Sequence, residues 1–200
     1  FPSEFEAKPR VLFHFNPYDA EKEREENNHY DRVVVGNTEI QNMLPFAHLI
    51  PYAIDLSFFK FNESYTEEKV VSISVAIIEG KKGVKEVDQA CNELGYKFKL
   101  VGRVSKVEYM KQVMEAARGS MEFWEDVDED KLREIYYSSA ITVCNSVDKF
   151  ESGTLPILEA MACGVPVLTR NVGHVSDLYD GANMVVRKGL SEDVEDLKKE

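Results

Sequence analysis

The chain has 200 residues, 44% of them hydrophobic, and a formal net charge of −12 at pH 7. Its length and apolar content suffice for one sizeable core and part of a second. The negative charge argues against nucleic-acid binding, because a phosphate backbone attracts a basic surface. No segment approaches the roughly 20 apolar residues of a membrane span, and no signal peptide is recognisable.

Three cysteines are scattered along the sequence, at Cys91, Cys144 and Cys163. Cys144 and Cys163 fall in patterns of a buried strand and a buried helix. An odd number of buried thiols favours reduced core cysteines over disulfides, and this predicts a cytoplasmic location.

Strands and helices alternate in the first part of the chain. We expect strands at residues 10–15, 31–35 and 48–50, a short helix at 38–44, and a charged exposed helix or loop at 20–30. The polar and aromatic stretch 58–68 is expected to be a linker.

From residue 70 the alternation becomes regular. Strands are expected at 70–78, 97–101, 121–123, 141–145, 165–169 and 183–186, and helices at 84–94, 106–117, 129–139, 155–163, 175–179 and 192–199. Such repeated β-α units predict an α/β fold with a Rossmann-like, doubly wound parallel sheet. Ligands bind such sheets beyond the carboxyl ends of the strands, so the loops expected to form the site are 80–83, 102–106, 123–127, 147–154 and 170–174.

The stretch from Glu151 to Leu168 carries the most information about function. Thr154 is expected to cap a short apolar helix that has Pro156 in its first turn, and Gly164 is expected to end it. Glu159 lies on this helix among apolar neighbours, where an ionised carboxylate needs a partner.

The start of this helix is a candidate anion site. The N–H groups of Gly153, Thr154 and Leu155 are free to bind an anion, with the positive end of the helix dipole behind them. The residues alone leave an alternative open, in which an internal lysine or tyrosine satisfies Glu159 and the helix start binds nothing.

This stretch resembles the signature of retaining GT-B glycosyltransferases of family 4 (glycosyl transferases group 1). These carry a glutamate, seven residues and a second glutamate, then Ala-Met-Ala-x-Gly-x-Pro-Val. Further strings that resemble the family cover roughly residues 31 to 196: Ile50–Asp55, Lys82-Gly83, Leu100–Gly102, Met121–Leu132 and Gly173–Asp177.

The resemblance implies two Rossmann-like domains that face each other across a cleft. Residues 57–200 would be the nucleotide-sugar donor-binding domain, and residues 1–56 would be the terminal part of the acceptor-side domain with the hinge. Most of the acceptor domain is then expected to be missing from this chain.

Several residue roles also follow from the resemblance. Glu159 would accept hydrogen bonds from ribose hydroxyls, and Glu151 would contact the transferred sugar. The amides of Gly153, Thr154 and Leu155 would hold the sugar and diphosphate. Lys82 would bind phosphate and offset the charge on the leaving diphosphate in place of a metal ion, so no cofactor is implied.

The chain departs from the family where a Gly-Arg pair normally precedes the lysine. The aligned positions are near Ala76 and Ile77, and no arginine lies in that strand. Arg103 and Lys81 are the candidates to replace the missing phosphate-binding cation.

Other candidates lie near the expected cleft. Glu125 replaces a family glycine in the loop that contacts the base, and Trp124 beside it is either a stacking partner of the base or a core residue. His14 ends a strand where family members often carry a histidine facing the donor sugar, although a structural role is the alternative. His174 replaces a family glycine, and no role is assigned to it.

The function expected from this resemblance is transfer of a sugar from a UDP-sugar or GDP-sugar to a hydroxyl of a glycan, lipid or small-molecule acceptor. Membrane contact, if any, would be peripheral and through the missing domain. The alternative is a non-catalytic nucleotide-sugar binding or scaffold subunit. A nicotinamide or flavin enzyme is disfavoured, because no strand is followed by G-x-G-x-x-G.

Overall fold

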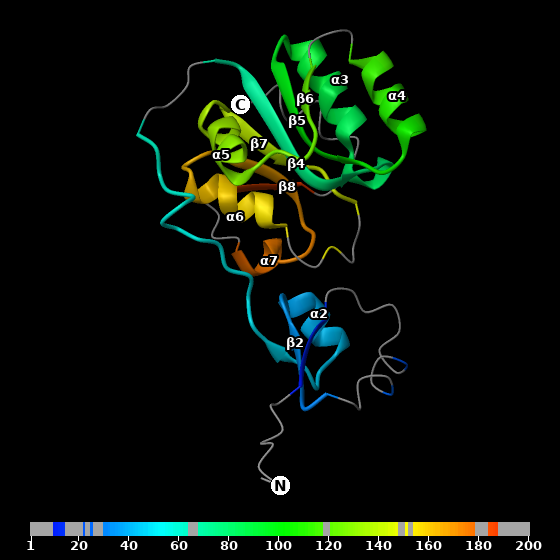
Figure 1. Ribbon diagram of the computed structural model, residues 1–200, viewed down its shortest axis with the longest axis vertical. Coiled ribbons are helices and arrows are strands. Elements are labelled where there is room, and N and C mark those ends of the chain that lie inside the picture. The colour runs from blue at the N-terminus through cyan, green and yellow to red at the C-terminus, as the bar shows by residue number, and fades with distance from the viewer. Residues whose placement is uncertain are drawn as a thin grey trace, which may run out of the picture.

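The computed structural model describes residues 10–14, 22, 25, 30–63, 68–117, 121–147, 151, 154–178 and 184–187. Two separate parallel sheets are formed, and the chain passes from the smaller to the larger between residues 49 and 70 (Figure 1). The α/β class and the parallel strands predicted from the sequence are confirmed.

The smaller sheet has the strand order β1-β2-β3, with bounds Val11–His14, Arg32–Val35 and His48–Leu49. Helix α2 (Thr38–Met43) begins where the Asn37 side chain accepts a 2.8 Å hydrogen bond from the Ile40 N–H. Alternate apolar side chains of β2 pack with those of α2 and the following turn into a small core: Val33, Val35, Ile40, Leu44 and Ala47.

The larger sheet has six strands, all parallel, in the order β6-β5-β4-β7-β8-β9. This is the order of dinucleotide-binding Rossmann folds, in which the chain starts in the middle and winds outward in both directions. The strands are β4 (Val70–Ile78), β5 (Lys97–Val104), β6 (Met121–Trp124), β7 (Ile141–Cys144), β8 (Val167–Arg170) and β9 (Met184–Arg187).

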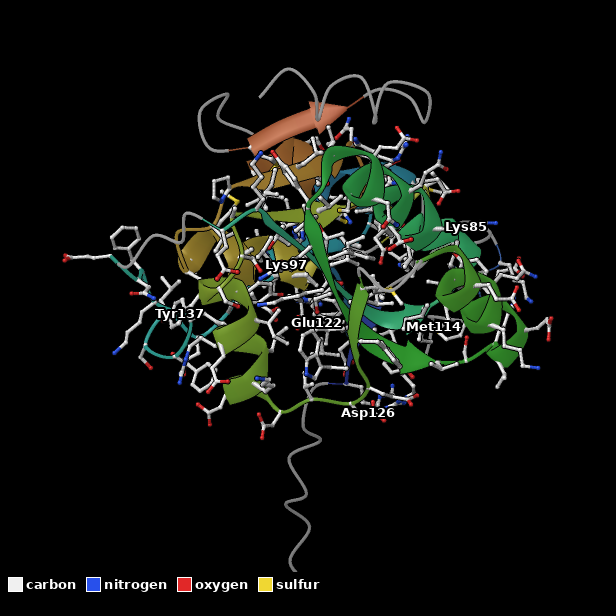
Figure 2. The ribbon with its side chains drawn as sticks, turned by 90° about the horizontal axis from the view of Figure 1, so that it is seen from above. Lys85, Lys97, Met114, Glu122, Asp126 and Tyr137 are labelled. Atoms are coloured by element: carbon white, nitrogen blue, oxygen red, sulfur yellow. The ribbon has the colours of Figure 1, made fainter. Side chains whose placement is uncertain are left out.

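Helices cover both faces of this sheet (Figure 2). Helices α3 (Val84–Leu94) and α4 (Val107–Ala116) pack on one face, and α5 (Glu129–Tyr137), α6 (Leu155–Ala162) and α7 (Val175–Leu178) pack on the other. Each face has its own apolar core, which is the doubly wound arrangement expected from the sequence.

Strand β5 continues three residues beyond its expected end, because Gly102 lets it follow a bulge in β4. The pairing register shifts between Ser74 and Ile77, and a side chain at Gly102 would overlap the carbonyl of Val75. Beyond this bulge Ile77 pairs with Arg103.

The segment expected to be a linker packs against the larger sheet. Phe59 is 5% exposed and lies in the core with α5 and α6. The carbonyl of Lys60 accepts a 2.8 Å hydrogen bond from the Tyr137 hydroxyl, and the ring of Phe61 lies against Gly164. The expected helix at 192–199 lies outside the described residues.

Candidate functional site

The site lies where β4 and β7 are neighbours in the larger sheet. From this pair the chain winds in opposite directions, so the loops at their carboxyl ends diverge and leave a crevice. After β4 the chain forms a short 3₁₀ turn, Gly80–Lys82, and after β7 it continues through Asn145 toward Glu151.

Lys82 and Glu151, which are far apart in sequence, meet at this crevice as an ion pair. The lysine side chain is 14% exposed and the glutamate side chain 19%, so both are largely buried. The Ser146 hydroxyl also donates to the same carboxylate oxygen, at 2.9 Å. The structure therefore brings together the two residues for which the sequence predicts a direct part in catalysis.

Glu159 is held on α6 by a partner from α5. The buried hydroxyl of Tyr136 donates a 2.7 Å hydrogen bond to its carboxylate. Burial raises the pKa of Glu159 above its ordinary value, and the hydrogen bond from Tyr136 opposes part of that rise. The alternative interpretation of the sequence expected an internal lysine or tyrosine to satisfy Glu159. The hydrogen bond from Tyr136 confirms that part of it.

Thr154 precedes α6, and Pro156 lies in the first turn, as the sequence predicts. Thr154 occupies the N-cap position as predicted, but within the described residues its hydroxyl makes no capping bond, and it lies 3.1 Å from the buried Nε2 of His174 instead. Burial lowers the pKa of His174, because it penalises the charged ring. Its Nδ1 has no hydrogen-bond partner in the described part of the chain.

The same region contacts the smaller sheet. The ring centroids of His174 and Tyr52 are 5.8 Å apart, and the Asp177 carboxylate accepts a 2.9 Å hydrogen bond from the Thr38 N–H at the start of α2. The segment after β8 thus touches both the start of α6 and the smaller sheet.

A small cavity of about 50 Å³ lies against Lys82 and Glu151, enough for a few water molecules. Ser74, Cys144 and Thr154 also line it.

The two candidate replacement cations are exposed. Arg103 lies directly beside Ile77 on the neighbouring strand, and its Nε donates to Asp126 at 3.2 Å. Lys81 is 3.2 Å from Glu79. The register therefore places Arg103 next to Ile77, where the resemblance leads us to expect the family arginine.

Trp124 and Glu125 lie at the carboxyl end of β6, two strands from β4. The Glu125 carboxylate accepts a 3.0 Å hydrogen bond from the Val104 N–H. Trp124 is half-buried, with the Lys131 amine 5.9 Å from its ring centroid. Figure 2 labels Asp126 in the loop that follows.

Leu155, at the start of α6, is described and exposed, whereas Gly153 lies outside the described residues. His14 ends β1, but its side chain also lies outside the description. Among the residues that are described, no group of three or more His, Cys, Asp or Glu side chains is arranged to hold a metal ion. Nor does the described part contain a helix with the length and apolarity needed to cross a membrane.

Sequence reasoning missed four buried polar residues around the site: Tyr136, Asn145, Ser146 and Arg170. A local signal existed only for Asn145, which directly follows a buried strand at the expected ligand edge. Tyr136 and Arg170 reach their partners from distant segments, so no local pattern marks them.

The fold is shared with several glycosyltransferases of known structure. HepE of Anabaena, solved with UDP and glucose, is 16% identical with a TM-score of 0.81, and the match covers 96% of this chain and 62% of HepE. Sucrose-phosphate synthase of Thermosynechococcus elongatus is 19% identical with a TM-score of 0.75, over 90% of this chain and 51% of that protein. A glycosyltransferase of Rickettsia africae is 12% identical with a TM-score of 0.78, over 94% and 59%.

This chain thus spans about half to three fifths of the length of these proteins. A search among curated proteins finds no match. The family described as Glycosyl transferases group 1 matches residues 57–197, which include the whole of the larger sheet and the Lys82–Glu151 pair. The chain belongs to the glycosyl transferases group 1 family.

Proposed function

We propose that this chain contains the donor-binding domain (residues 57–200) and the terminal part of the acceptor-side domain (1–56) of a retaining, family 4 hexosyltransferase. The donor is a UDP-sugar or GDP-sugar, and the acceptor is a hydroxyl of a glycan, lipid or small molecule. A cytoplasmic location is also proposed, supported by three free cysteines.

The observation that carries this proposal is the meeting of Lys82 and Glu151 at the switch point of the larger sheet. A cation beside a carboxylate at the carboxyl ends of β4 and β7 suits a ligand with both phosphates and hydroxyls. On donor binding, Lys82 exchanges the Glu151 carboxylate for a phosphate oxygen, and Glu151 becomes available to a sugar hydroxyl. The lysine charge then offsets negative charge as it builds on the leaving diphosphate.

Glu159 is proposed to accept the ribose hydroxyls. Its carboxylate already has one donor, Tyr136, which fixes its orientation on α6. Two further hydroxyl donors would stabilise its ionised form against burial. Loss of a charged hydrogen bond is worth about 1.5–3 kcal/mol, or roughly 10- to 150-fold in affinity.

Arg103 is the favoured second phosphate ligand because of its register with Ile77. Its partner Asp126 is exposed, so exchange of that partner for a phosphate costs little. Lys81 is the second candidate, and the amides of Gly153, Thr154 and Leu155 complete the anion site. Trp124 and Glu125 are proposed to contact the base.

A thermal-shift and calorimetric screen with uridine, guanosine and adenosine diphosphates and their sugars tests the proposal. At a ligand concentration of 100 Kd, the free energy of unfolding should rise by about 2.7 kcal/mol. A 10- to 150-fold loss of affinity in Glu159→Ala should cut this gain to about half or less at the same ligand concentration, while the protein stays folded. If none of these nucleotides shifts the unfolding temperature at millimolar concentration, the proposal is contradicted.

A non-catalytic nucleotide-sugar binding or scaffold subunit is the second candidate. The observation that favours it is Ile77, an exposed apolar residue at the position where the family carries a phosphate-binding arginine. Donor hydrolysis and transfer by the intact protein separate the two: binding without any turnover supports the scaffold role.

A further inference from the structure

The backbone is tied on both sides of Lys82 to the segment that follows β7. The Val147 N–H donates to the Lys81 carbonyl at 2.8 Å, and the Asn145 side-chain amide donates to the Gly83 carbonyl at 3.3 Å. These two bonds flank Lys82, so they fix the point from which its side chain reaches toward the crevice.

Asn145 and Gly83 are in close contact as well as hydrogen bonded. Gly83 has a φ of 63°, in the left-handed region that glycine tolerates best, and ends the turn that carries Lys82. A side chain at Gly83 would overlap the amide group of Asn145. The position of Asn145 is therefore coupled directly to the path of the backbone next to Lys82.

The orientation of the Asn145 amide is set by Arg170 at the end of β8. The Arg170 Nε donates a 2.6 Å hydrogen bond to Asn145 Oδ1. A guanidinium can only donate, so it fixes the oxygen on its own side and leaves the NH₂ group to face the Gly83 carbonyl. The contacts from Arg170 through Asn145 to Gly83 form a relay of hydrogen bonds. Asn145 is 5% exposed and Arg170 8%, so this relay is shielded from water.

Burying a guanidinium at the end of a strand carries a desolvation penalty that an apolar side chain of similar volume would not carry. Replacement of buried charged groups by apolar residues of similar volume is often neutral or stabilising. Packing alone therefore does not account for Arg170, and the orientation of the Asn145 amide beside Lys82 is one task that its guanidinium performs.

We propose that Arg170 and Asn145 are positioning residues, which act through Gly83 to aim Lys82 at the crevice. This inference rests on the proposed function for its catalytic consequence, because Lys82 is there the residue that meets the diphosphate. The contacts that place Lys82 are independent of that function and are tested separately.

Three variants separate the relay from general packing. Asn145→Asp keeps the volume and a partner for Arg170, but puts an acceptor oxygen opposite the Gly83 carbonyl. Arg170→Met removes the group that orients the amide, and Arg170→Lys retains a donor. Thr142→Val is the matched control, because it removes from β7 a buried hydroxyl that is hydrogen bonded to Ser72 and lies three residues before Asn145.

The direct measurement is the rate at which acetic anhydride modifies Lys82, followed by mass spectrometry well below the unfolding temperature. Lys97, which pairs with Glu68 on an exposed surface, is the internal reference. Asn145→Asp and Arg170→Met should raise the Lys82 rate about fivefold, the factor that corresponds to one hydrogen bond, and Arg170→Lys should restore part of the difference. An unchanged rate in both variants, or an equal rise in Thr142→Val, overturns the assignment.

Kinetics on the intact protein then tests the consequence. Asn145→Asp and Arg170→Met should lower kcat by at least the same factor, while KM for the donor changes less. The reason is that Lys82 stabilises the charge on the leaving diphosphate more in the transition state than in the bound donor. A loss in KM alone would contradict a role in aiming Lys82. If no nucleotide binds the wild-type protein, the proposed function fails, but the acetylation rates still decide the positioning role.

Discussion

The Tyr136 hydroxyl and the Glu159 carboxylate form a 2.7 Å hydrogen bond between α5 and α6, so a half-buried carboxylate is held by a neutral partner. Burial is also the main reason that the pKa of Tyr136 is raised well above its ordinary value, and the nearby Glu159 adds to the effect. The hydroxyl therefore stays protonated and remains a donor to Glu159.

Glu159 should make the protein less stable as the pH rises. Its pKa in the folded state is raised from an ordinary value of 4.5, so the folded protein holds this proton more tightly than the unfolded chain. Its contribution to the free energy of unfolding is thus greatest below pH 4.5 and is lost as the pH rises through the folded pKa. Urea unfolding of wild type and Glu159→Gln between pH 4 and 8 should show this difference.

Glu115→Gln, which changes an exposed carboxylate on α4, is the control for that comparison. Tyr136→Phe should extend the window to higher pH, because it removes the hydrogen bond that holds the Glu159 pKa down. A difference between wild type and Glu159→Gln that grows in favour of wild type as the pH rises would contradict the assignment.

Changes to the Lys82–Glu151 pair should have opposite effects on nucleotide binding. Glu151→Gln releases Lys82 from its partner, so affinity for the nucleoside diphosphate should rise by up to about fivefold while transfer falls. Lys82→Met should weaken binding roughly 10- to 150-fold. Calorimetry with the nucleoside diphosphate measures both. Lys97→Met, at an exposed ion pair, should bind like wild type.

Arg103→Ala should weaken diphosphate binding about tenfold while the free energy of unfolding changes by less than about 0.5 kcal/mol. The guanidinium is exposed and pairs only weakly with Asp126, so little stability is lost with it. Asp126→Asn should bind at least as tightly as wild type, because it releases Arg103. Lys106→Ala, an exposed cation between β5 and α4, is the control, and an equal loss there would refute a specific role for Arg103.

All three thiols should resist modification in the native state. Burial raises the pKa of Cys91 to about 12 and that of Cys163 to about 11, and it raises the pKa of Cys144 as well. Thiolate is the reactive form, so a disulfide reagent at pH 8 should react slowly. In guanidinium chloride three thiols per chain should react at once, and fewer than three would reveal a disulfide.

The regular β-α pattern from residue 70 onward made the larger sheet predictable, because strand and helix periodicities are local properties of the sequence. The strand pattern predicted the loops 80–83 and 147–154 at the ligand edge, and the resemblance to the family singled out Lys82 and Glu151 within them. The position at which β5 ends was not predictable from the sequence, because the strand continues past Gly102 only in the presence of the bulge in β4.

The contacts around α6 show where prediction from local sequence stops. Thr154 has the residue type and position of a helix cap, but His174, twenty residues later, lies beside its hydroxyl. Arg103 and Asp126 likewise come together only because β5 and β6 are neighbours. Such pairings depend on the tertiary fold, and no spacing within one element reveals them.

The packing of Phe59 and Phe61 against the larger sheet limits where the molecule can bend. The ring of Phe59 is buried in the core and that of Phe61 lies against Gly164. The chain from residue 58 to 62 therefore moves with the larger sheet as one body. Ile54 packs against the same core, so any swivel between the two sheets is confined to the few residues between Ile50 and Ile54. A proline or a glycine placed in that short stretch would change the range of opening while leaving every side chain that faces the crevice in place.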